Sequence, residues 1–126
     1  MNPFVVNDET KTMVMDNICY LLNNFIHCSQ YENIIFCWVL HEQEIIDSIL
    51  SKLDIKNLKV ISISLLCNKN ALRERIQKDI DNELRSNDVL ERSIERIPLY
   101  EKLDTIKIEV SEKTVADTVN EIMQLK

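Results

Sequence analysis

Apolar residues recur along the chain with two different periods, and the pattern predicts alternating helices and strands. In residues 9–27, Val14, Ile18 and Leu22 return at the spacing of a helix face. Residues 33–40 instead form a continuous apolar run, Asn-Ile-Ile-Phe-Cys-Trp-Val-Leu, whose β-branched and aromatic content favours a strand buried on both faces. The same reasoning predicts helices over 9–27, 42–53, 69–84, 88–97 and 113–125, and strands over 33–40, 58–66 and 104–110.

The ends of these elements have recognisable signals. Asn7 is a good N-cap for the first helix, and Pro98 is expected to stop the helix over 88–97. Strands that alternate with helices predict a parallel sheet covered on both faces. The sequence therefore predicts a single α/β domain over residues 1–126, with three layers and a short parallel sheet.

Charge and composition narrow the class of protein. The net charge of −6 disfavours nucleic-acid binding through a basic field. No apolar run reaches the roughly 18 residues needed to span a bilayer, and the first residues do not resemble an export signal. The four cysteines form no Cys-x-x-Cys pair. We therefore expect reduced thiols in a cytoplasmic protein that does not act at a membrane.

Glycine is absent from the sequence. An average chain of this length would contain roughly nine glycines. The absence excludes from these 126 residues both Gly-x-x-x-x-Gly-Lys-Ser/Thr and Gly-x-Gly-x-x-Gly, the glycine-dependent phosphate-binding motifs.

All five arginines fall within residues 73–96. Arginine binds phosphate bidentately, and a helical pair carrying arginines would suit a lid that closes over a nucleotide. The alternative is a set of surface ion pairs, because acidic residues are interleaved with these arginines. Spacing alone leaves both interpretations open.

His41 and Glu42 follow the first predicted strand, where ligands bind in open α/β sheets. The Glu42 carboxylate could orient a metal-bound water, or His41 could act as a base. Alternatively, Glu42 favours the N-terminus of the next helix and His41 is a loop residue. The His and Cys spacings match no tetrahedral ligand set, so no metal site is expected from them.

The order of elements and several strings resemble P-loop kinases of the group containing adenylate-, shikimate- and gluconate-kinase-like proteins, including uncharacterised bacterial ATP-binding proteins. The similar strings are Met-Asn-Pro-Phe at 1–4, Phe-Cys-Trp-Val at 36–39, Leu-Leu-Cys at 65–67, Leu-Arg-Glu-Arg at 72–75, residues 90–100 and Thr-Ile-Lys-Ile at 105–108. They resemble the segment after the family's second strand, its third and fourth strands, its lid and its fifth strand. The resemblance covers nearly the whole chain, but the family's first strand, P-loop and second strand have no counterpart.

The resemblance implies a function and a set of site residues. It implies ATP with Mg²⁺, and a lid over about 69–98 in which Arg75, Arg85 and Arg92 contact nucleotide phosphates. It places the acceptor side at Asn2 and Phe4. The adenine side would be formed by the loop after the fifth strand, namely Ser111, Glu112, Lys113 and Thr114.

Two functions remain open on this basis. The chain is either the substrate and lid portion of an ATP-dependent small-molecule or nucleotide kinase, inactive alone without a P-loop, or a non-catalytic α/β module that binds a ligand or a partner. An in-frame P-loop encoded upstream, with Met1 as an internal methionine, would favour the first. Because the first strand of the family lies between strands matching 33–40 and 58–66, we expect those two strands to lack a partner and the chain to form a homodimer. The alternative is that the two strands pair directly.

Overall fold

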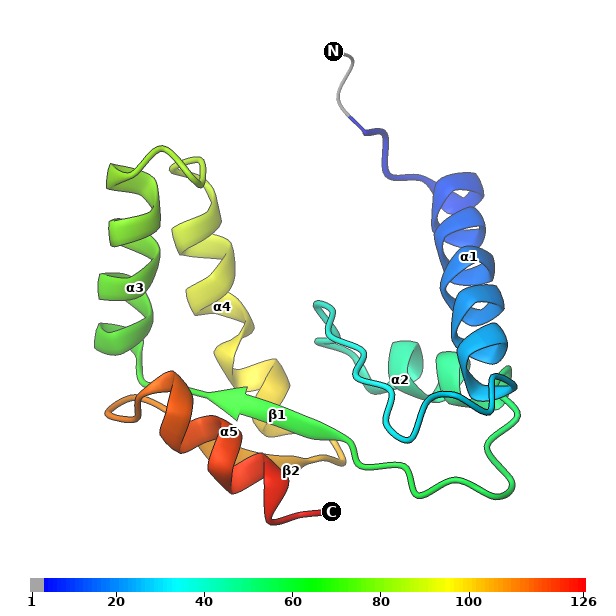
Figure 1. Ribbon diagram of the computed structural model, residues 1–126. Helices are drawn as coiled ribbons and strands as arrows, with labels where there is room; N and C mark the ends of the chain where they lie inside the picture. Colours follow the sequence, from blue (N-terminus) through cyan, green and yellow to red (C-terminus); the bar gives the residue numbers. More distant parts are fainter. Residues whose placement is uncertain (1–3) are drawn as a thin grey trace. The chain divides into compact units, whose positions relative to one another are not determined.

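The computed structural model describes residues 4–126, which form two compact units (Figure 1). The first unit ends at Val60, and the second covers Ile61–Lys126. The first contains helices α1 (Asp8–Ile26) and α2 (Gln43–Ser51). The second contains strand β1 (Ile63–Leu66), helices α3 (Lys69–Asp81) and α4 (Val89–Glu101), strand β2 (Ile106–Glu109) and helix α5 (Val115–Met123).

Helix α1 begins where the sequence predicts. The Asn7 side chain accepts a hydrogen bond from the Thr10 backbone N–H at 2.9 Å, and the Thr10 hydroxyl accepts one from the Asn7 N–H at 2.9 Å. This reciprocal pair is a capping box, which satisfies two backbone donors at the start of the helix. Asn7 as the N-cap is thus confirmed.

The core of the first unit forms between α1 and α2. Cys19 and Leu22 of α1 are buried with Ile49 of α2. At the end of the same face, the Asn23 amide donates to the Lys52 carbonyl at 2.9 Å, and its oxygen accepts from the Asp54 N–H at 2.9 Å. Apolar packing and this bridging amide together hold the two helices in register.

The prediction of a buried strand over 33–40 is wrong for this structure. The segment has no regular secondary structure, and Ile35 is 92% exposed. An apolar run becomes a strand only when a neighbouring strand supplies hydrogen-bond partners for its backbone. Among the described residues of the first unit there is no strand to provide them.

The sheet lies in the second unit and has two strands, where the sequence predicted three. Strands β1 and β2 are parallel, with Ile63 opposite Ile106 and Leu66 opposite Glu109. The strand predicted over 58–66 is thus limited to its last four residues, because β2 is short and its first amide, the Ile106 N–H, already bonds to the Ser62 carbonyl. Buried Ser64 is satisfied by the Thr105 hydroxyl at 2.7 Å, which explains a polar residue in a core strand.

Helices α3 and α4 pack side by side as an arm, and α4 also packs against β1. Pro98 was predicted to stop α4, but the helix continues through it to Glu101. A proline removes only one backbone donor, and here a single further turn follows it. The core beneath the arm contains Ile76, Leu103, Ile108 and Val110.

The chain leaves helix α3 through a residue with a positive φ, two residues after the helix ends at Asp81. Glu83 has a φ of 58°, its N–H donates to the Ile80 carbonyl, and the Leu84 N–H donates to the Asp79 carbonyl. These two bonds form a Schellman motif, in which glycine is the usual left-handed residue. A chain without glycine places a glutamate there, and the helix predicted over 69–84 stops at Asp81.

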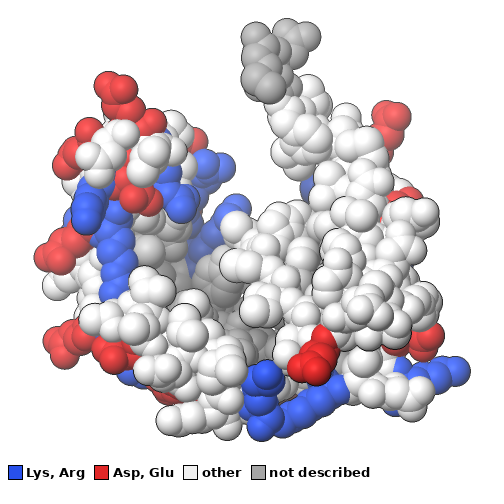
Figure 2. Space-filling view, viewed as in Figure 1, with Lys and Arg blue, Asp and Glu red and all other residues white. Residues whose placement is uncertain are grey.

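The expected α/β class with a short parallel sheet is confirmed at this level. That residues 1–126 form one domain stays a prediction. Within residues 4–126, no helix is long and apolar enough to cross a membrane. On the face shown in Figure 2, basic and acidic side chains are interleaved over the α3–α4 arm.

Candidate ligand-binding edge

The carboxyl ends of β1 and β2 bring two loops together. Because the strands are parallel, both chains leave the sheet at the same edge, through Cys67–Asn68 and through residues 110–114. The Asn68 N–H donates to the Ser111 hydroxyl at 2.8 Å, and the Val110 N–H donates to the Leu66 carbonyl at 2.7 Å. We call Cys67, Asn68 and residues 111–114 the carboxyl edge. Ligands of open α/β sheets bind at this kind of edge.

Two helices begin at the carboxyl edge, and each is capped by its own side chain. The Asn68 side chain accepts from the Ala71 N–H at 2.8 Å. The Thr114 hydroxyl accepts from the Asp117 N–H at 3.1 Å, and Asp117 accepts in return from the Thr114 N–H. An anionic ligand at either helix start would therefore compete with a cap that is already formed.

Glu109 places a carboxylate beside the predicted adenine-side loop. The Ser111 N–H donates to Glu109 Oε1 at 2.8 Å, and the Ser111 hydroxyl donates to the same oxygen. These bonds lower the pKa of Glu109, the hydroxyl contributing most, with smaller contributions from Lys113 and Arg75. The negative charge thus persists to lower pH than usual and disfavours phosphate at this position.

Arg75 connects α3 to the loop that follows β2. Its Nη2 donates to the Val110 carbonyl at 2.6 Å and to the Ser111 carbonyl at 3.1 Å. The predicted contact of Arg75 with phosphate stays a prediction, but in this structure the guanidinium stabilises the carboxyl edge itself. Burial raises the pKa of the neighbouring Cys67 thiol, so this cysteine is held in its protonated form.

The structure does not bring Arg85 and Arg92 to the carboxyl edge. Arg85 lies in the connection between α3 and α4, and Arg92 lies in the first turn of α4. Helix α3 has 13 residues, so its far end is about 20 Å from the edge at which it begins. Both arginines therefore lie at the tip of the arm.

Both tip arginines have acidic partners. Arg85 Nε lies 2.9 Å from Asp79 Oδ2, and Arg92 Nη2 lies 3.1 Å from Asp88 Oδ2. A hydrogen bond from Ser86, more than the charge of Arg92, lowers the pKa of Asp88. The two arginine side chains remain half exposed, so these surface pairs can exchange for a phosphate at little cost.

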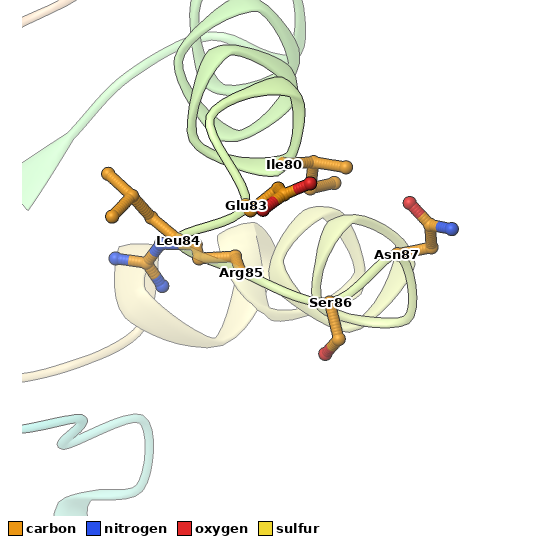
Figure 3. A pocket seen from close by; sticks show the side chains of 6 residues that line it. All are labelled: Ile80, Glu83, Leu84, Arg85, Ser86 and Asn87. Atoms are coloured by element: carbon orange, nitrogen blue, oxygen red, sulfur yellow. The ribbon is translucent and has the colours of Figure 1, made fainter.

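A surface hollow at the tip of the arm does not have the form of a binding site. Its lining side chains point in different directions (Figure 3), with Leu84 and Arg85 on one side and Asn87 on the other. A ligand pocket needs polar groups that converge on one point. The hollow therefore adds no site to the carboxyl edge.

The remaining predicted site residues are Asn2, Phe4, Glu112 and Lys113. Asn2 lies outside them, and Phe4 is 63% exposed ahead of α1. Glu112 is exposed in the carboxyl edge, and Lys113 pairs there with Glu121 of α5. Among residues 4–126, no group of three or more His, Cys, Asp or Glu side chains could hold a metal ion.

His41 and Glu42 precede α2 and contact each other. His41 Nε2 lies 3.3 Å from Glu42 Oε1. The other ring nitrogen, Nδ1, is buried without a hydrogen-bond partner in the part of the chain that the structure describes. This geometry leaves the base and structural interpretations of His41 both open.

Sequence reasoning missed Asn68 of the carboxyl edge and Glu109, which bonds to Ser111 of that edge. Asn68 had a usable signal, because it stands between a predicted strand and a predicted helix as an N-cap does. Glu109 had none, since its role depends on the side-chain bond to Ser111. No protein-family model matches the chain, and no curated protein or solved structure matches it either.

Proposed function

We propose that this chain is the substrate and lid portion of an ATP-dependent small-molecule or nucleotide kinase-like protein, with a three-layer fold, and that it does not transfer phosphate by itself. The observation that carries the proposal is the junction of the two loops at the carboxyl edge, where the Asn68 N–H meets the Ser111 hydroxyl at 2.8 Å. In open α/β sheets this is the position of the ligand.

The α3–α4 arm supports the lid role. It begins at the carboxyl edge, matches most of the lid expected over 69–98, and carries Arg85 and Arg92 at its tip. Closure of such an arm would move two exchangeable guanidinium groups towards the phosphates of a nucleotide whose base lies beside residues 111–114. The nucleotide would then lie between residues 111–114 and the closed arm, with Mg²⁺ bound by its phosphates.

Catalysis by this chain alone is not expected. The backbone amides and the lysine of a P-loop position the phosphates in this class of kinase, and a sequence without glycine cannot build that loop. Glu109 adds a negative charge where the loop after β2 begins. A coupled kinase assay with the purified chain should show no magnesium-dependent turnover.

Nucleotide binding is the direct test of the proposed site. In ¹⁵N NMR spectra, titration with ATP and Mg²⁺ should shift the amides of Asn68 and residues 111–114 before others. Lys113→Gln should weaken this binding several-fold, because it removes a positive charge from the edge. Lys102→Gln, an exposed lysine at the end of α4, is the matched control and should leave binding unchanged. Absence of shifts at millimolar ATP would refute the nucleotide site.

The lid role has its own test in a longer gene product. If an in-frame P-loop segment is encoded upstream, Arg85→Ala and Arg92→Ala should each lower turnover of that product. One arginine at a phosphoryl transition state contributes several kcal/mol. Unchanged turnover in both variants would show that these arginines only form surface ion pairs with Asp79 and Asp88.

The second candidate function is a non-catalytic α/β module that binds a ligand or a partner. One observation favours it: Arg75, Arg85 and Arg92 all have partners inside the chain. In that case ATP should shift no amide at the carboxyl edge. Arg85→Ala and Arg92→Ala would then have only the small effects of losing surface ion pairs.

A further inference from the structure

We draw no further inference here: the strongest candidate, the exposed apolar run over residues 33–40 of the first unit, carries none because nothing in the structure shows what covers it.

Discussion

The two units of the chain differ in whether their strand-forming sequences pair with another strand. In the second unit, β1 and β2 pair with each other, and Ile108 at their centre is 2% exposed. In the first unit, the run 33–40 is more apolar than either strand, yet it stays unpaired and Ile35 is 92% exposed. The comparison teaches that apolar content makes a strand possible, while an available backbone partner decides whether it forms.

The units also differ in charge. Of the charged residues, 12 fall in residues 1–60 and 24 in residues 61–126. Some charged side chains of the second unit stabilise its own fold, as Arg75 does through its hydrogen bonds to two carbonyls. In the first unit the run 33–40 contains no charged residue, and Glu32 and Glu42 lie just outside it.

The largest expected effect comes from the paired strand. Ile108→Ala should lower the free energy of unfolding of the second unit by about 3 kcal/mol, because it leaves a cavity in a closed core. Ile106→Ala in the same strand is the matched control: its side chain is 45% exposed, so the loss should stay below about 1 kcal/mol. Urea unfolding followed by circular dichroism measures both. Equal losses would mean that β2 has no buried face.

Arg75 provides the next test, because it joins α3 to the carboxyl edge of the paired unit. Arg75→Ala should cost about 1.5 kcal/mol of unfolding free energy, since two carbonyls lose a charged donor. Arg73→Ala, an exposed arginine on the same helix, should cost less than about 0.5 kcal/mol. If the two variants unfold at the same urea concentration, the bonds of Arg75 do not stabilise the edge.

Replacing Glu83 by glycine should increase the stability of the second unit. Glu83→Gly should stabilise the second unit by about 1 kcal/mol, because glycine adopts a φ of 58° without the steric cost of a Cβ atom. Glu83→Ala keeps the Cβ atom and should give no such gain. A rise in melting temperature for glycine alone would confirm that strain at this helix end, and not charge, is the cause.

The smallest effect concerns pH. The pKa of Glu109 is lower in the folded chain than its ordinary value of 4.5, so its contribution to stability is fully present above about that pH. The contribution is lost as the pH falls through the folded-state pKa. Glu109→Gln should therefore flatten the decline of unfolding free energy below pH 4.5, and Glu112→Gln should not. Identical acid profiles for the natural chain and Glu109→Gln would contradict the bond to Ser111.

Sequence periodicity located all five helices, because each has an apolar stripe. Asn7 marked the start of α1, but Pro98 did not mark the end of α4. Periodicity could not predict the pairing of strands, which depends on residues distant in the chain. Residues 33–40 have strand composition but form no ladder within residues 4–126, while 63–66 and 106–109 pair with each other. The carboxyl edge was predicted through Ser111–Thr114, but the bonds of Arg75 and Glu109 depend on side-chain geometry that spacing does not determine.

Amide hydrogen exchange tests the difference between the units most directly. At a concentration where the chain is monomeric, the account predicts slow exchange at the paired amides of 63–66 and 106–109, and fast exchange throughout 33–40. Equal protection of 33–40 and the sheet in the monomer would show that the run has a partner within its own chain, and would contradict the account.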